Sequence, residues 1–287
     1  MVEIEGRTFP VRGMYLEDVL EGTGERVSEE LWVKPKGDLK GKAAVRMRQG
    51  GGVRGKVQID YYDEEGVIWD NGNYGGYEGY RDLVRGDMRK VDEGRINYGL
   101  IVKVVVGYLK REGMFKDEPG EEEGGGGVLV FMPGKGEIER LRREIEGCRE
   151  WREIGKKGVK VHPLHSSLDP GKQSEVLRGK GVKVIISTNI AETSVTIESV
   201  TMVVDAGLVR EVGVSKRTGS SVLECKWTSR ASTMQRQGRA GRVREGVCIK
   251  MFSKFTEREV MRAEGQPEIG RMPLEEVRHS EERRQRA

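Results

Sequence analysis

The chain has 287 residues, enough for one large domain or for a medium domain with additional segments. It carries 51 lysines and arginines against 47 aspartates and glutamates, a formal net charge of +4, so overall charge alone does not indicate a nucleic-acid partner. Three cysteines without CxxC spacing argue against a disulfide framework and favour a reduced, intracellular protein, in the cytoplasm or the nucleus. With no signal peptide and no apolar run near about 18 residues, we expect a soluble protein with no membrane partner.

The first 90 residues hold little that predicts a packed core. Residues 1–20 predict a short strand and a helix that begins at Tyr15, and they are typical of the end of a preceding domain or of a docking strand. Residues 21–90 contain a basic, glycine-rich stretch (34–56) and, over 61–80, five of the eight tyrosines of the chain. This composition favours a disordered insertion, although interleaved basic and aromatic residues can also bind single-stranded nucleic acid.

Residues 91–127 predict a helix followed by a linker. The apolar run from Asn97 to Val106 is long enough to favour a helix over a strand. The stretch DEPGEEEGGGG (117–127) is acidic and glycine-rich, which is typical of a flexible connector and marks a domain boundary.

Residues 128–256 alternate between strand-like and helix-like patterns. The predicted strands cover 128–132, 159–164, 182–188, 200–207 and 246–252, and the predicted helices cover 137–148, the residues after Pro170 and the arginine-rich stretch 227–244. This alternation indicates an α/β domain with a parallel sheet covered by helices on both faces. Residues 208–214 and 221–226 alternate like the strands of an inserted β-hairpin. Beyond the sheet, we expect a helix over 256–264 and another that begins at Pro273.

The stretch STNIAETSVTI (187–197) follows the third of these strands. Open parallel sheets bind ligands beyond the carboxyl ends of their strands. Five hydroxyl groups and one amide within these eleven residues are a high polar density for that position. A capped helix start at Thr188 or Asn189 would need only one of them. The surplus suits a phosphate backbone, which receives most protein–nucleic acid hydrogen bonds.

The stretch QRQGRAGR (235–242) separates its three arginines by small residues. If the stretch is helical, Arg236, Arg239 and Arg242 share a face, because they are three residues apart. Planar guanidinium groups suit phosphate oxygens. The two glycines, each costing up to ~1 kcal/mol in a helix, would let the backbone approach a ligand closely. The residues therefore favour an anion site, with a solvated basic surface helix as the alternative.

Together, these two stretches resemble the fifth and sixth motifs of the DEAH-box RNA helicases. The flanking segments that share the resemblance are IEGRTFPV (4–11), INYGLIVKVV (96–105), LVFMPGKGEI (129–138), VHPLHSSLDPGKQSEVL (161–177), VVDAGLVRE (203–211) and QPEIGRMPLEEV (266–277). The resemblance covers nearly the whole chain except about residues 21–90, and the motifs taken together are highly specific.

The resemblance implies a RecA-like, three-layer αβα fold of the P-loop NTPase type for residues 128–256, the second of two such domains that bind ATP between them. It implies a motor that couples ATP hydrolysis to translocation on RNA or to RNA unwinding. Its cofactors would be ATP and Mg²⁺, bound mainly through the first RecA-like domain of a longer protein, and its partners RNA and that domain. The implied order is the end of the first domain (1–20), the insertion (21–90), a leading helix and linker (91–127), the second RecA-like domain (128–256) and the start of a helical region (257–287).

The same resemblance implies roles for individual side chains. Gln235 would contact the γ-phosphate or the attacking water, and Arg239 and Arg242 would be arginine fingers that stabilise the transferring phosphoryl group. The other implied nucleotide contacts are Leu177, Thr196 and Glu198. The implied contacts to the RNA backbone are Ser166, Thr188 and Asn189.

Three features depart from the family pattern, apart from the insertion. Glu198 stands where relatives often have Asp, and Leu177 stands where many have a Phe that stacks on the base. No GxxxxGK[ST] or DEAH sequence occurs in the 287 residues, so the phosphate-binding loop and the Mg²⁺-binding acids are missing. We therefore expect this chain alone to be inactive as an ATPase. A non-hydrolysing RNA- or protein-binding module is the alternative, and DNA in place of RNA stays open.

The histidines and cysteines predict no metal centre. His162 and His165 have a spacing that a metal could use, but no Cys or acidic third ligand is near them in the sequence, so we expect structural roles. Cys148, Cys225 and Cys248 are expected to be buried or incidental rather than reactive.

Overall fold

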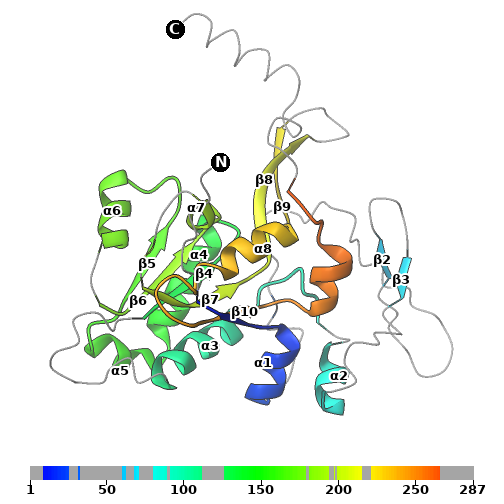
Figure 1. Cartoon of the computed structure of the whole chain (residues 1–287), viewed down its shortest axis with the longest axis horizontal. Coiled ribbons are helices and arrows are strands. Elements are labelled where there is room, and N and C mark those ends of the chain that lie inside the picture. Colours follow the sequence, from blue (N-terminus) through cyan, green and yellow to red (C-terminus); the bar gives the residue numbers. More distant parts are fainter. Residues whose placement is uncertain are drawn as a thin grey trace, which may run out of the picture.

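Six of the described strands form one parallel sheet at the centre of the molecule (Figure 1). This computed structural model describes residues 9–25, 32, 60–62, 68–70, 80–88, 91–111, 126–178, 181–193, 197, 199–214 and 221–265. The strand order is β1-β10-β7-β4-β6-β5, and every neighbouring pair is parallel. The parallel sheet predicted for residues 128–256 is confirmed.

The secondary structure follows the predicted alternation closely. The sheet strands are β1 (Val11–Met14), β4 (Gly127–Phe131), β5 (Lys160–Leu164), β6 (Lys183–Ser187), β7 (Val200–Asp205) and β10 (Gly246–Lys250). The helices are α1 (Leu16–Thr23), α2 (Asp82–Met88), α3 (Tyr98–Arg111), α4 (Lys135–Gly147), α5 (Trp151–Lys156), α6 (Pro170–Arg178), α7 (Ile190–Thr193), α8 (Arg230–Gln237) and the π-helical turn η2 (Thr256–Val260). Two antiparallel pairs complete the described elements: β2 (Asp60–Tyr62) with β3 (Ile68–Asp70), and β8 (Leu208–Val214) with β9 (Ser221–Trp227). No helix in the described ranges has both the length and the apolar character needed to cross a membrane.

Helices cover both faces of the sheet, which explains why its central strands are almost wholly apolar. Successive residues of β4 point to opposite faces. Val128 and Val130 pack in one cluster with residues of α3, α4 and α5. Leu129 and Phe131 pack in a second cluster with residues of α6, α7 and the turn after α8 (Figure 1). The predicted three-layer arrangement is therefore confirmed.

The apolar spacing of α3 accounts for its form and its position. Ile101, Val105 and Leu109 are four residues apart, lie on one face and are completely buried. The run that favoured a helix over 97–106 is thus helical, as predicted. In α4, Ile138, Leu141 and Ile145 have the same kind of spacing and the same complete burial.

The inserted hairpin is also confirmed. Strands β8 and β9 pair from Leu208 with Trp227 at the base to Val214 with Ser221 at the far end. The hairpin rises away from the sheet in Figure 1. Near its base it is attached to the domain by an ion pair, in which Nη2 of Arg210 donates to Oε1 of Glu137 on α4 at 2.9 Å.

Strand β1 brings the N-terminal part of the chain into the same sheet. Residues 11–14 pair in parallel with residues 246–249 of β10, so the docking strand, one of the two interpretations of this segment, is what the structure shows there. Helix α1 begins directly after Tyr15, as predicted. Within the 21–90 segment, Trp32, Val84 and Met88 are buried in the larger cluster.

Two helices are shorter than predicted. The arginine-rich stretch 227–244 is helical only over α8, because the chain turns at Gly238. The helix predicted over 256–264 is reduced to η2, which ends where the backbone N–H of Met261 donates to the carbonyl of Thr256. The helix predicted at Pro273 lies outside the described residues.

Candidate functional site

The carboxyl edge of the sheet brings the three predicted RNA-contact residues together. Ser166 follows β5, and Thr188 and Asn189 follow β6, its neighbour in the sheet. The backbone N–H of Thr188 donates to the carbonyl of Leu164 at 3.2 Å, which joins the two strand ends. Ser166 and Asn189 are exposed and Thr188 is half-buried. Neutral hydrogen-bonding groups therefore lie at adjacent strand ends, where the sheet meets solvent.

Helix α8 places the arginine-rich stretch beside this edge. Its first turn is capped by Ser229, whose hydroxyl accepts from the backbone N–H of Ser232 at 3.2 Å. The helix packs against α7 and β7. Because α7 begins directly after Thr188 and Asn189, its contact with α8 links these two RNA-contact candidates to the helix that carries Gln235.

Arg236 points into the protein. Its side chain is 1% exposed, Nε donates to Oε2 of Glu192 at 3.0 Å, and Nη1 donates to Oδ1 of Asp205 at 2.8 Å. The guanidinium carbon lies 4.9 Å from the centre of the Phe131 ring. Burial disfavours the charge, but the two carboxylates outweigh it and raise the pKa of Arg236. These four residues, referred to as the Arg236 cluster, tie α7, α8, β4 and β7 together.

Arg239 and Arg242 lie on residues 238–242, referred to as the arginine turn. Arg239 is 8% exposed and Arg242 is exposed. Burial and the neighbouring charge of Arg242 lower the pKa of Arg239, while Glu192 opposes the shift. Arginine stays protonated in proteins, so the turn holds two neighbouring like charges, one of them partly desolvated. An anion bound there would relieve this repulsion.

Gln235 is the third member of the predicted catalytic set. It is exposed on α8, four residues before Arg239 and therefore about one helical turn away along the chain. Gln235 and Arg242 make no side-chain hydrogen bond or ion pair with any residue that the structure describes. Both side chains are available to a ligand.

On a continuous helix, the spacing predicts that the three arginines share one face. In the structure they do not. Arg236 faces the core, whereas Arg239 and Arg242 belong to the turn, because α8 ends at Gly238. The explanation of the second glycine changes as well. A Cβ on Gly241 would overlap the carbonyl oxygen of Phe9. The glycine is therefore needed because the chain around Phe9 packs closely against it, and not because a ligand does.

The remaining nucleotide-contact candidates are Leu177, Thr196 and Glu198. Thr196 and Glu198 lie outside the described residues. Leu177 belongs to α6, and its side chain is also outside the described part. The roles expected of these three residues stay predictions.

His162 lies in the middle of β5, and His165 directly follows that strand. His162 is half-buried and His165 is buried. Burial, with a smaller contribution from Lys135, lowers the pKa of His165, so its ring is neutral at pH 7. Within the described ranges, no group of three or more His, Cys, Asp or Glu side chains is arranged to hold a metal ion.

The cysteines carry no sign of reactivity. Cys225 and Cys248 are buried and Cys148 is half-buried. Burial raises the pKa of the Cys225 thiol to about 12, so its reactive thiolate is scarce at pH 7.

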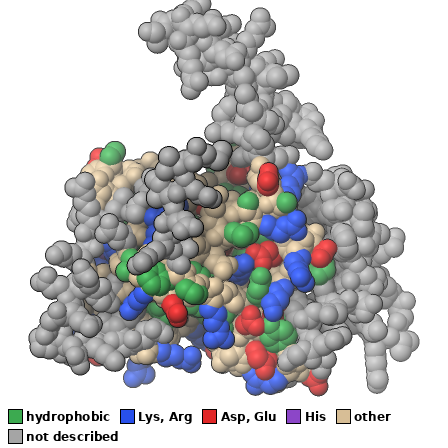
Figure 2. All heavy atoms as spheres, viewed as in Figure 1, with side chains coloured by type: hydrophobic (Ala, Val, Ile, Leu, Met, Phe, Trp, Pro, Cys, Tyr) green, Lys and Arg blue, Asp and Glu red, His purple; other side chains and the backbone are tan. Residues whose placement is uncertain are grey.

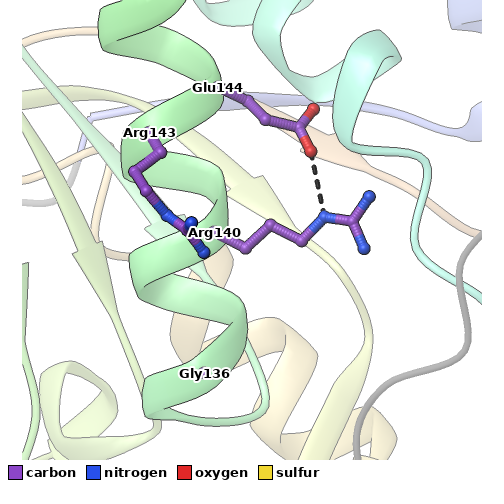
Figure 3. A pocket seen from close by; sticks show the side chains of 4 residues that line it. All are labelled: Gly136, Arg140, Arg143 and Glu144. Carbon is purple, nitrogen blue, oxygen red and sulfur yellow. Dashed lines mark hydrogen bonds and ion pairs between the residues drawn. The ribbon is translucent and has the colours of Figure 1, made fainter.

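A hollow of about 460 Å³ runs along α4 (Figure 3). Helix α4 covers the face of the sheet opposite to the face that α7 covers. Its lining residues are Gly136, Arg140, Arg143 and Glu144. Nε of Arg140 donates to Glu144 at 3.0 Å, and its guanidinium carbon lies 4.4 Å from the centre of the Tyr98 ring. On the face in Figure 2, basic and acidic side chains are interspersed over the described surface. The hollow holds none of the predicted site residues, which lie at the sheet edge and on α8 and the arginine turn.

Glu192 and Asp205 are two residues of this region for which the sequence pattern indicated no role. A signal for Asp205 was nevertheless present, because it ends the apolar strand β7 and a buried carboxylate requires a cation or hydrogen-bond donors. Glu192 lies among the hydroxyl residues of the 187–197 stretch, where its charge suggested no separate role.

Known proteins match this chain over ranges that include the stretches 187–197 and 235–242. The family described as helicase conserved C-terminal domain matches residues 108–244. Over 96% of its length the chain is 33% identical to the ATP-dependent RNA helicase dhx29 of Xenopus laevis, and 34% identical to the chloroplastic DExH-box ATP-dependent RNA helicase DExH4 of Arabidopsis thaliana. It spans 20% and 18% of those proteins, about a fifth of their length.

The fold is similar to that of a solved helicase. The crystal structure of the Escherichia coli DEAH/RHA helicase HrpB matches with a TM-score of 0.52 and 23% identity, and the match covers 92% of this chain and 22% of that one. The six-stranded parallel sheet, its two helical layers and the inserted hairpin form a RecA-like α/β fold.

Proposed function

We propose that this chain, which contains a helicase C-terminal domain and is similar to DEAH-box helicases, is the second motor domain of an ATP-dependent RNA helicase. In this proposal the domain couples ATP hydrolysis to translocation on RNA or to RNA unwinding. The chain spans about a fifth of its relatives and contains no phosphate-binding loop sequence. The proposal therefore includes a preceding RecA-like domain that holds most of the contacts to ATP and Mg²⁺.

The arginine turn is the observation that carries the nucleotide half of the proposal. ATP held between the two domains supplies the transferring phosphoryl group, whose equatorial oxygens gain charge stabilisation from guanidinium groups. Arg239 and Arg242 offer two such groups on one short turn. Arg239 is partly desolvated, which strengthens its interaction with an anion relative to a fully solvated arginine. Gln235 would orient the attacking water.

The residues at the strand ends next to α7 support the part of the proposal that concerns RNA binding. Ser166, Thr188 and Asn189 offer hydroxyl and amide groups, which bind phosphate and sugar oxygens without reading base sequence. Helix α7, which follows Asn189, is joined to α8 by the hydrogen bond between Arg236 and Glu192. The proposed RNA-binding edge of the sheet and the arginine turn are therefore connected through the same two helices. We propose that this connection lets RNA binding at the edge favour the arrangement of the turn that hydrolysis needs.

The test joins this chain to the preceding domain of its own gene and measures RNA-stimulated ATP hydrolysis. We expect Arg239→Ala to lower kcat on the order of 10³-fold, because an arginine finger acts on the transition state. The KM for ATP should change little. Arg244→Ala, an exposed neighbour outside the proposed site, is the matched control and should retain kcat within about twofold.

Two results would contradict parts of this proposal. Equal losses in ATP affinity and in kcat would mark Arg239 as a ground-state binding residue. An intact joined protein that binds single-stranded RNA without hydrolysing ATP would instead favour the non-hydrolysing binding module. Titrations with RNA and DNA strands of one sequence, at one salt concentration, would decide between the two nucleic acids.

A further inference from the structure

The residues that lead into β1 run directly beside the arginine turn. The backbone N–H of Phe9 donates to the carbonyl of Gly241 at 2.8 Å, and the backbone N–H of Gly246 donates to the carbonyl of Pro10 at 3.1 Å. The first bond lies within the turn and the second lies just beyond it, at the start of β10. Residues 9–14, referred to as the leading segment, therefore hold the backbone on both sides of Arg242.

A side chain at the end of α8 makes a third link to the same segment. Nε2 of Gln237 donates to the carbonyl oxygen of Val11 at 3.4 Å. Gly13 lies beside this amide, since a Cβ on Gly13 would be 3.7 Å from Oε1 of Gln237. The leading segment thus contacts the helix end before the arginine turn as well as the turn itself.

The two glycines of the turn differ in what surrounds them. A Cβ on Gly241 would overlap the Phe9 carbonyl oxygen and lie 2.7 Å from Cγ2 of Val11. A Cβ on Gly238 would be 3.5 Å from the nearest atom, the carbonyl oxygen of Met234, which is an ordinary contact. Neither glycine has a positive φ, so backbone conformation does not require them. Gly241 is required because the leading segment approaches closely.

We propose that the leading segment positions the guanidinium groups of Arg239 and Arg242, and that it acts through Gly241 and Gln237 as positioning residues. This inference rests on the proposed function of the two arginines as a phosphate-binding pair. One hydrogen bond joins Gly241 of the turn to the leading segment, and two more join it to Gln237 and Gly246, on either side of the turn. Pairing with β10 fixes the register of β1. In a protein with a preceding domain, the leading segment lies on the chain path from that domain, so a shift of the segment would move the arginines.

The test compares Gly241→Ala with the matched variant Gly238→Ala in the 287-residue chain, with inorganic tripolyphosphate as the probe. The new methyl group meets the Phe9 carbonyl in the first variant and makes an ordinary contact in the second. We expect Gly241→Ala to weaken binding about tenfold, comparable to the loss of one charge-assisted hydrogen bond, and Gly238→Ala to weaken it less than about twofold.

A cycle with the double variant Arg239→Ala, Arg242→Ala separates positioning from general loosening. If Gly241→Ala acts through the arginines, it should weaken the residual tripolyphosphate binding by less than about twofold once both arginines are removed. A full additional tenfold loss in that background would overturn the proposal. So would wild-type affinity in a Gly241→Ala chain whose leading segment has detached from the turn.

Amide hydrogen exchange of residues 9–14 and 239–246 supplies a readout that needs no ligand. We expect Gly241→Ala to speed exchange in both stretches together, and Gly238→Ala to leave the leading segment unchanged. If Gly241→Ala does not fold, Gln237→Ala removes one of the three links and should speed exchange in the same stretches to a smaller extent. A loosened leading segment beside an unchanged turn would overturn the positioning role. Failure of the wild-type chain to bind tripolyphosphate would count against the proposed function instead, and the exchange data would still decide whether the segment holds the turn.

Discussion

The Arg236 cluster and the arginine turn use the same side chain in opposite ways within eight residues of sequence. In the cluster, one guanidinium meets two carboxylates and an aromatic ring, and every member is buried. In the turn, two guanidinium groups neighbour each other, one partly desolvated and one exposed. In the first arrangement the one cation is surrounded by two carboxylates, whereas in the second the exposed Arg242 pairs with no residue that the structure describes.

In our proposal, the surroundings of each arginine, and not the number of arginines, distinguish the structural residue from the ligand-binding ones. A buried ion pair costs desolvation energy and contributes little net stability, yet removing one partner is expensive. A pair of like charges on a turn destabilises the unliganded fold slightly and becomes favourable only when an anion arrives. The cluster therefore joins helices and strands within the fold, and the turn is where we propose that the anion binds.

Arg236→Met should produce the largest effect on stability. Methionine fills similar space but leaves Glu192 and Asp205 without their cation, and breaking a buried pair in this way costs about 3–5 kcal/mol. We expect the urea midpoint of the 287-residue chain to fall accordingly. A loss below about 1 kcal/mol, the usual scale for surface substitutions and exposed ion pairs, would remove the distinction between the cluster and the turn.

Much of the fold could be predicted because its signals are local and periodic. The β4 run VLVF has no polar residue, which is expected of a strand buried on both faces. Residues 101, 105 and 109 of α3 repeat at helical spacing, and the β8–β9 stretches alternate around a short connection. Each of these patterns is decided within a few residues, so the sequence alone was sufficient.

The inner arrangement of the site could not be predicted because it depends on contacts between distant residues. Three arginines at equal spacing look alike in the sequence, and only the end of α8 at Gly238 sends Arg236 inward and the other two onto a turn. The reason for Gly241 lies at Phe9, at the other end of the chain. Spacing on an assumed helix held no information about either contact.

Within the cluster, Asp205→Asn should cost more than Glu192→Gln. Asp205 is completely buried at the end of a central strand, and its Oδ1 also accepts the backbone N–H of Gly207 at 2.8 Å. Glu192 lies on the four-residue helix α7 and is slightly exposed. We expect losses of about 3 and about 1.5 kcal/mol, the range for hydrogen bonds to charged groups, measured by urea unfolding. The reverse order would mean that α7, and not the sheet, holds Arg236 in place.

Arg242→Ala should produce the smallest change in stability. The side chain is exposed and pairs with no described residue, so its removal should alter the free energy of unfolding by no more than about 0.5 kcal/mol. Tripolyphosphate binding should nevertheless weaken, and the difference from wild type should shrink as salt is raised, because the contact is electrostatic and solvent-exposed. Arg244→Ala, equally exposed on the adjacent bend, should change neither quantity. If Arg242→Ala lowered stability as much as a cluster substitution, Arg242 would have a structural role, and the anion site would have to rest on Arg239 alone.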